Sequence, residues 1–368
     1  MYWLETLDPA ILRHVMLAYW LALAFVLGAA VGSFVNVAVA RLPLEKSLVW
    51  PGSRCGLCLQ PVRWYHNLPL VSFLWLRGRC RLCGGRFSSR YFWVELGTAL
   101  GFAGLFWVEV VQNIHGWNPV RRDPLPMPPW PWLVGFGYHA VLFSFLMAAS
   151  VCDLRSREIP LPLTLTGTAV GLIGATLLPW PWPWSPADAA PRPRLAFAFP
   201  AWQMGDIKQG IYPWPFWGPL PEFFDPGGNW QTGLATGLAG ALVGTFLMRG
   251  VGFLFTKGLG KEAMGLGDAD LMMMAGAFLG WQVVVIGFLL SAFPALAFGV
   301  IRFISYRDNA LPFGPSLSIG VLGTYLAWHA IGPGIQQFFF HGVIMICLAG
   351  AAAGIMLVLA FMFRLAKG

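Results

Sequence analysis

Apolar runs of about twenty residues recur along this chain and decide what it can fold into. Runs such as 14–39, 131–151 and 231–255 are long enough to cross the ~30 Å hydrocarbon core of a bilayer as helices. Hydrophobic residues make up 57% of the chain and charged residues 11%, and the mean hydropathy is +0.64. Soluble globular chains carry about 25% charged residues. The sequence therefore predicts an all-α polytopic membrane protein.

Basic residues set the predicted orientation of the spans. Nine of the 24 Lys and Arg residues lie in 41–90, where Glu45 is the only acidic residue. The positive-inside rule places this insert in the cytoplasm, so the net charge of +8 reflects topology and we expect no nucleic-acid partner. Counting from this anchor predicts about nine transmembrane helices, one at 14–39, three in 91–178 and five in 231–363, with a division near Gly280.

The insert 179–230 and Asn36 in the first span are two further features of this topology. Residues 179–230 are rich in Pro and Trp, and we expect them to form an extracytoplasmic insert against the membrane interface. Asn36 lies in the first span, where small residues permit close helix packing. Its amide is either a hydrogen-bonding group between helices or part of a site.

The insert 41–90 carries four cysteines as two pairs, Cys55 with Cys58 and Cys80 with Cys83. Two CxxC pairs at this separation match the ligand spacing of a four-thiolate zinc site. The alternatives are two disulfides or four free thiols, and a cytoplasmic location disfavours disulfides. Because four thiolates fill the coordination shell of Zn²⁺, the predicted ion is structural and not catalytic.

Two aspartates lie where apolar runs meet cytoplasmic loops. Asp153 ends the run 131–151 beside a basic loop, and Asp268 follows Gly265 and Gly267 at the start of another run. An ionisable residue at such a place is a functional hypothesis by default. Two close carboxylates share one proton, which supplies the base and the acid that peptide hydrolysis needs. The glycines permit close backbone approach, although each Asp alone could be a helix N-cap.

Asp270 competes with Asp268 for the role of partner to Asp153. The two residues lie about 200° apart around a helix, so only one of them can face Asp153 well. Motifs for serine proteases and metalloproteases are missing from the sequence, which weakens those readings without eliminating them.

Several ordered motifs resemble the type IV prepilin peptidase family of GxGD aspartyl proteases. They are GSFVNVAVARLP (32–43), the CxxC pairs, NLPLVSFLWLRGRC (67–80), SSRYFWVELGTAL (88–100), Asp153 with Ile159-Pro160, GLGD (265–268) and PFGPSLSIG (312–320). The resemblance implies that Asp153 and Asp268 form a catalytic dyad in a multi-pass protein of the bacterial inner membrane. It also implies that prepilins or pseudopilins lose a basic leader at the cytoplasmic face and are then N-methylated from S-adenosylmethionine.

The chain departs from the family pattern at two positions. Members commonly carry an Asp where this chain has Leu161, and a Lys where it has Asp270, so its leader preference could differ. The methyltransferase half has no glycine-rich fingerprint for S-adenosylmethionine. Glu95 could bind the new amino terminus, or it could extend from the membrane edge to water.

Two other functions compete with this interpretation. One is a different GxGD-type intramembrane protease that cuts within helices. The other is a non-enzyme, either a cation transporter or an assembly platform with a zinc knuckle. The cysteine module and the motifs at 32–43 and 312–320 favour the prepilin peptidase, and paired inverted repeats of a transporter are not apparent.

Overall fold

The computed structural model describes residues 8–114, 128, 130–178, 230–259, 265–306, 312–339 and parts of 346–358. Helices are the regular structure throughout this part of the chain, which confirms the all-α class. Five of the described helices are long and apolar enough to cross a membrane, and Leu161–Leu177 is a shorter apolar helix. The predicted insert 179–230 lies outside the described residues except for Trp230.

The chain divides into two compact units. Unit 1 comprises Met1–Ile114 and Asn118–Cys152, and unit 2 comprises His115–Trp117 and Asp153–Gly368. Unit 1 contains α1 (Pro9–Arg41), α2 (Val71–Trp75), α3 (Arg90–Phe106), the π-helix Trp107–Val111 and most of α4 (Trp130–Ser156). Unit 2 contains the last turn of α4, α5 (Leu161–Leu177), α7 (Trp230–Leu259), α8 (Leu266–Tyr306) and α9 (Gly314–Phe339).

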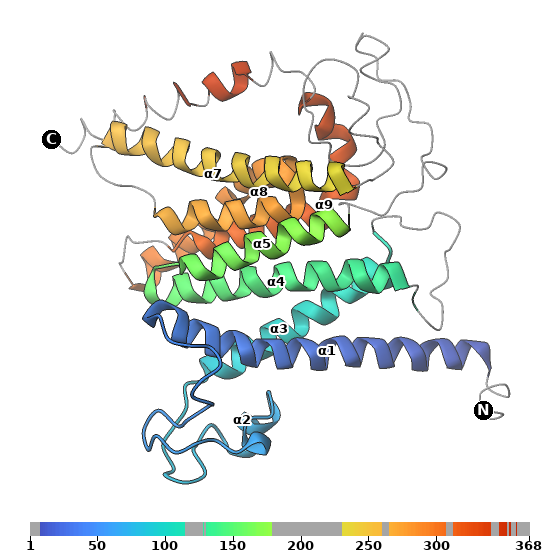
Figure 1. Ribbon diagram of the computed structural model, residues 1–368, viewed down its shortest axis with the longest axis vertical. Coiled ribbons are helices and arrows are strands. Elements are labelled where there is room, and N and C mark those ends of the chain that lie inside the picture. Colours follow the sequence, from blue (N-terminus) through green and yellow to red (C-terminus); the bar gives the residue numbers. More distant parts are fainter. Residues whose placement is uncertain are drawn as a thin grey trace. The chain divides into compact units, whose positions relative to one another are not determined.

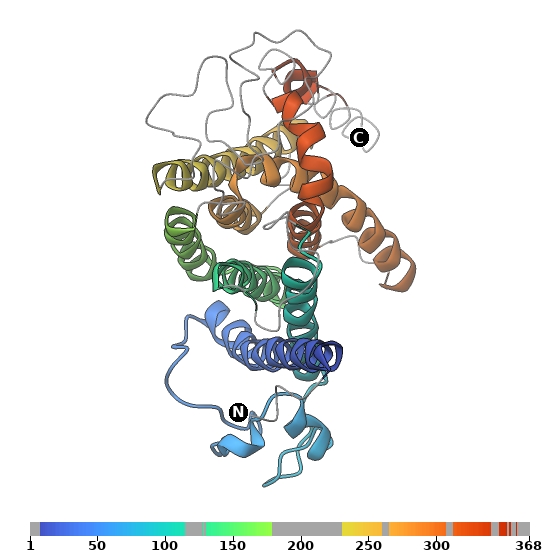
Figure 2. The ribbon, with the colours of Figure 1, turned by 90° about the vertical axis from the view of Figure 1, so that its right-hand side faces the viewer.

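In unit 1, α3 packs against α1 through small residues one turn apart (Figures 1 and 2). A Cβ atom added at Gly32 would lie 2.8 Å from the Cα of Glu95, so the two backbones nearly touch. One turn further along α1, the Asn36 side chain donates a hydrogen bond to the carbonyl oxygen of Tyr91 at 3.0 Å. Asn36 therefore joins the two helices, as the interhelical interpretation expects.

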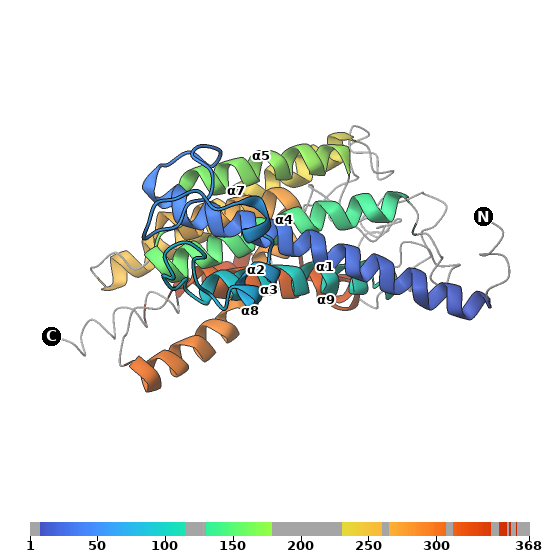
Figure 3. The same cartoon turned by 90° about the horizontal axis from the view of Figure 1, so that it is seen from below.

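In unit 2, α7 and α8 lie side by side with their backbones in contact (Figure 1). Gly240 of α7 and Gly276 of α8 meet at this contact, and a Cβ atom at either would collide with the carbonyl group of the other. Helix α8 breaks at Gly280, whose φ of 78° and ψ of 170° are not helical. The break lies where the sequence suggests a division, and the later part of α8 extends away from α7 (Figures 2 and 3).

Candidate active site

Asp153 lies in the last turn of α4 and is held by the start of α9. Its side chain is nearly buried, with 7% of its surface exposed. The backbone N–H of Gly314, the first residue of α9, donates a hydrogen bond of 2.7 Å to Oδ2 of Asp153. A Cβ atom at Gly314 would lie 2.8 Å from the same oxygen, so only glycine fits this approach. Sequence reasoning missed this role of Gly314, whose one signal was its place in the 312–320 motif.

Asp268 lies in the first turn of α8, and its neighbour Gly267 packs on the loop that follows Asp153. A Cβ atom at Gly267 would lie 3.0 Å from Cβ of Ile159 and 3.3 Å from its backbone N and O. This contact brings the half-buried Asp268 close enough to Asp153 for the two carboxylates to repel each other when both are charged. Gly265 has open space where a side chain would go. The close backbone approach expected of the two glycines therefore belongs to Gly267.

Asp270 is directed to a different partner. Its carboxylate is attracted by the positive charge of Arg249 on α7, the helix that packs against α8. Of the two acidic residues at the start of α8, Asp268 is thus the one whose electrostatic partner is Asp153. The different helical faces expected for Asp268 and Asp270 correspond to these two environments.

The sulfur atoms of Cys55, Cys58, Cys80 and Cys83 all lie within 4.8 Å of one another. The sulfurs of Cys55 and Cys83 are 3.8 Å apart. Four thiolates around a tetrahedral Zn²⁺ at about 2.3 Å would place sulfurs about 3.8 Å from each other, so the donor set fits this ion. The fold therefore brings the two CxxC pairs, which are distant in the sequence, together as one possible metal centre.

Each cysteine pair sits in the same kind of turn. The N–H of Cys55 bonds to the carbonyl of Gln60 at 3.0 Å, and the N–H of Cys80 bonds to that of Gly85 at 2.8 Å. The turn residues Leu59 and Gly84 have positive φ angles of 56° and 67°. The two turns thus form a repeated knuckle.

The local backbone tunes the thiols of these knuckles. The N–H groups of Cys58 and Leu57 donate to the sulfur of Cys55 and lower its pKa to about 6. For Cys83, the N–H of Gly85 favours the thiolate, but desolvation and the neighbouring thiols outweigh it and raise the pKa to about 11. Cys55 and Cys83 therefore differ in how readily they ionise, and a bound divalent cation would favour the thiolate form of all four cysteines.

Glu95 links the cysteine insert to the membrane helices of unit 1. Its Oε2 accepts a hydrogen bond of 2.8 Å from the backbone N–H of Leu70, at the start of α2. The side chain of Ser33 on α1 bonds to the same carboxylate. Glu95 is half-buried at this junction, so the structure gives it a connecting role that neither sequence interpretation included.

A buried ionisable pair in unit 1 was also missed from the sequence. Oε2 of Glu109 lies 3.1 Å from Nδ1 of His139, and the two side chains are 0% and 4% exposed. Glu109 belongs to the π-helix that follows α3, a local widening that often accompanies functional positions. The two residues are 30 positions apart, so no local motif signals their contact.

The geometry defines a class of protein: a helical membrane protein whose second unit brings two aspartates together at helix ends. Comparison with known families agrees with this class. Residues 26–109 match the model of the bacterial peptidase A24 N-terminal domain. Residues 216–300 match the model of the type IV leader peptidase family. The first match contains the four cysteines, and the second contains Asp268.

Individual relatives extend the similarity over most of the chain. The prepilin leader peptidase/N-methyltransferase of Pectobacterium carotovorum subsp. carotovorum is 30% identical over 329 residues, covering 82% of this chain and 91% of the relative. The protein of that name from Pseudomonas putida is 29% identical, covering 82% and 88%. The one from Myxococcus xanthus is 32% identical, covering 73% of this chain and 58% of the relative.

The chain belongs to the type IV leader peptidase family, and it is an enzyme of that family. The resemblance expected from the ordered motifs is thus confirmed. A search of solved structures found no match to the chain.

Proposed function

We propose that this chain is a membrane-embedded aspartyl endopeptidase that removes the basic leader from type IV prepilins or type II secretion pseudopilins. The observation that carries the proposal is the convergence of Asp153 and Asp268, through the Gly314 hydrogen bond and the contact of Gly267 with Ile159. The names of the relatives support the substrate class.

The two carboxylates would divide the proton transfers of hydrolysis between them. One accepts a proton from a water molecule as the water oxygen attacks the scissile carbonyl carbon. The other donates a proton to the departing amine nitrogen, so that the leader ends in a carboxylate and the product begins with a new amino group. The Gly314 N–H fixes Oδ2 of Asp153, which leaves Oδ1 to hold the water.

The four cysteines would hold a structural Zn²⁺. Sulfur atoms within 4.8 Å of one another and paired knuckles support this assignment. The ion would supply folding free energy to the insert, because thiolate ligation and folding are coupled. It would take no part in cleavage, since no coordination position stays open.

We extend the proposal to S-adenosylmethionine-dependent methylation of the new amino terminus, on the strength of the relatives' names. No set of side chains in the described part of the chain is assigned to this cofactor, so we derive no methylation step. Glu95 is committed to Leu70 and Ser33, which makes it a poor choice for binding a free amine.

The topology that completes the proposal has about nine spans in the bacterial inner membrane, with the cysteine insert and both aspartates facing the cytoplasm. The clustering of basic residues in 41–90 supports this orientation. Such an arrangement suits a substrate whose basic leader stays in the cytoplasm while its apolar helix lies in the bilayer.

Cleavage of a prepilin with a basic leader, followed by the product's amino-terminal mass, tests the proposal. We expect the wild type to cut, Asp153→Asn and Asp268→Asn to lose cutting, and Asp270→Asn to retain it. An added methyl mass would establish the second activity. If either dyad variant cuts normally while the protein is folded, the assignment of the dyad is wrong. Cutting within the apolar helix would instead indicate another intramembrane GxGD protease.

A further inference from the structure

Helix α2 of the cysteine insert has one packed face and one exposed apolar face. On the packed face, Ser72 is buried and the ring of Phe73 lies 5.4 Å from that of Phe92 on α3. On the other face, Val71, Leu74 and Trp75 are 56%, 64% and 63% exposed. The spacing i, i+3, i+4 places these three side chains on one stripe of the helix. So much apolar surface on a docked element signals a further partner.

The anchor points of α2 place it at the edge of the bilayer. The α3 span Arg90–Val111 has 22 residues, or ~33 Å, which is about the thickness of the hydrocarbon core. Tyr91 and Trp93 in its first turn are 45% and 63% exposed, as expected for aromatic residues at a membrane interface. Glu95 lies one turn further in, and it binds the N–H with which α2 begins.

The figures agree with this level. In Figures 1 and 3, α2 lies alongside the length of α1 and not beyond its end. Because α1 is a candidate membrane span, this position agrees with an interfacial level for α2.

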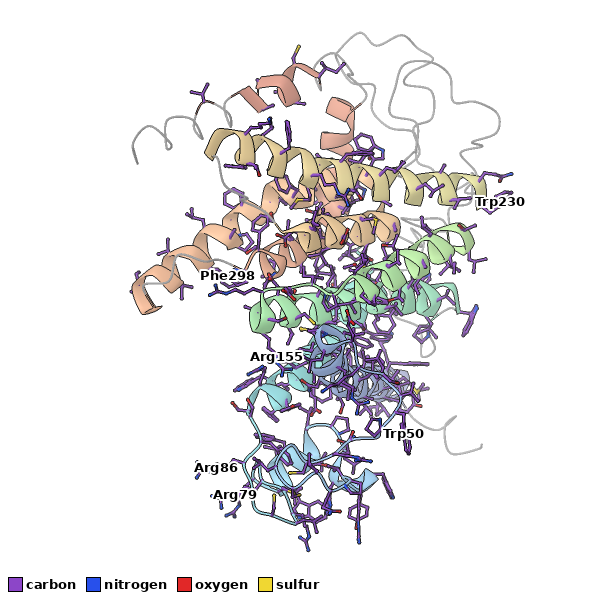
Figure 4. The ribbon with its side chains drawn as sticks, turned by 60° about the vertical axis from the view of Figure 1, so that its left-hand side comes forward. Trp50, Arg79, Arg86, Arg155, Trp230 and Phe298 are labelled. Carbon is purple, nitrogen blue, oxygen red and sulfur yellow. The ribbon has the colours of Figure 1, made fainter. Side chains whose placement is uncertain are left out.

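The charge of the insert complements an anionic surface. Residues 46–94 contain no Asp or Glu. Arg77 and Arg79 follow α2 directly, and both are exposed. Figure 4 marks Arg79 together with Arg86, which is paired with it by a backbone bridge. Lys and Arg beside an interfacial helix attract the phosphates of anionic lipids.

We propose that α2 is an interfacial anchor for the cysteine insert. Val71, Leu74 and Trp75 enter the boundary between headgroups and acyl chains, while Arg77 and Arg79 contact lipid phosphates. Because Glu95 ties α2 to α3, the anchor fixes the insert against the membrane instead of letting it move freely in water. This inference is independent of the proposed protease activity and of the metal.

Photo-crosslinking of the full chain tests the anchor. p-Benzoyl-L-phenylalanine replaces Leu74 in one variant and Leu82 in the control, since Leu82 is 71% exposed but lies in a cysteine knuckle outside α2. A third variant carries the probe at Val71, so that a folding failure at one site does not leave the question open. Each variant is placed in nanodiscs of phosphatidylcholine, with or without phosphatidylglycerol, and its adducts are identified by intact mass.

We expect phospholipid adducts at 71 and 74 several-fold above those at 82, with a higher yield when phosphatidylglycerol is present. Adducts to a second copy of the chain would overturn the proposal, because the stripe would then be a protein interface. The absence of lipid adducts at 71 and 74, or equal adducts at 82, would overturn it as well. A yield of lipid adducts that does not change when phosphatidylglycerol is added would refute the proposed contact of Arg77 and Arg79 with lipid phosphates.

Discussion

Replacing Gly267 by alanine should separate activity from stability in this enzyme. The new Cβ would lie 3.0 Å from Cβ of Ile159, whereas carbon atoms in contact prefer about 3.5–4.0 Å. The start of α8 or the side chain of Ile159 must therefore give way by a few tenths of an ångström. A displacement of about 1 Å at reacting groups can cost ~100-fold in rate, so for a smaller shift we expect kcat to fall by roughly 3- to 10-fold.

The same substitution should change stability little. Overpacking costs about 1–3 kcal/mol, but alanine is better than glycine in a helix by about 1 kcal/mol. The net loss is then roughly 0–2 kcal/mol, which leaves a folded protein. A loss of activity larger than this stability change would come from the geometry of the two aspartates.

Gly265→Ala is the matched control, because its Cβ would meet nothing within 4 Å. Both variants are compared in steady-state cleavage of a prepilin, with kcat and KM measured separately, and in thermal unfolding in detergent. We expect Gly265→Ala to keep its rate within about a factor of two, as a side chain in open space displaces nothing. Wild-type kcat in folded Gly267→Ala, or an equal loss in both variants, would refute the argument.

Other contacts give further expectations. Gly314→Ala places a Cβ 2.8 Å from the Asp153 oxygen, so kcat should fall at least as far as in the first case while KM changes little, as steady-state assays would reveal. Glu109→Ala removes a buried partner and should lower the free energy of unfolding by roughly 2–4 kcal/mol, with Glu109→Gln milder in thermal melts. A double-mutant cycle between Arg249 and Asp270 should give a coupling of about 0.2–1 kcal/mol in stability. Bound zinc, measured by mass spectrometry, should be retained at neutral pH and released on acidification, because protons compete with the metal for the thiolates. The thiol of Cys55 has a lowered pKa in the folded module, so the stability it contributes is also lost on acidification. A chelator should likewise remove the metal and unfold the insert, as read by proteolysis.

Local sequence patterns predicted many features of this structure. Long apolar runs predicted helices, and the break at Gly280 followed from a run too long for one span. The two CxxC pairs predicted a four-sulfur cluster, because short spacing within each pair leaves few ways to arrange the thiols. Each apolar run and each CxxC pair is a pattern of residues that are close together in the sequence.

Contacts between residues that are distant in the sequence could not be predicted from local patterns. The donor to Asp153 is a backbone N–H 161 positions away, and a backbone group leaves no side-chain signature in the sequence. Glu95 similarly accepts a hydrogen bond from the backbone N–H of Leu70. The sequence does not reveal this partner, so from the sequence the carboxylate of Glu95 could be assigned to substrate binding. A buried acid predicts that some partner exists, but the fold alone decides which one.

Asp270 illustrates how this limit affects function. From the sequence, an acidic residue so close to Asp268 looked like a rival for the dyad or a cause of altered leader preference. In the structure the positive charge of Arg249 on the neighbouring helix α7 is close enough to attract its carboxylate. The positive charge of Arg249 acts on the negative charge of Asp270, whereas Asp268 is the acidic group of α8 on which the charge of Asp153 acts. The double-mutant cycle between Arg249 and Asp270 therefore tests whether the departure at position 270 forms an interhelical pair.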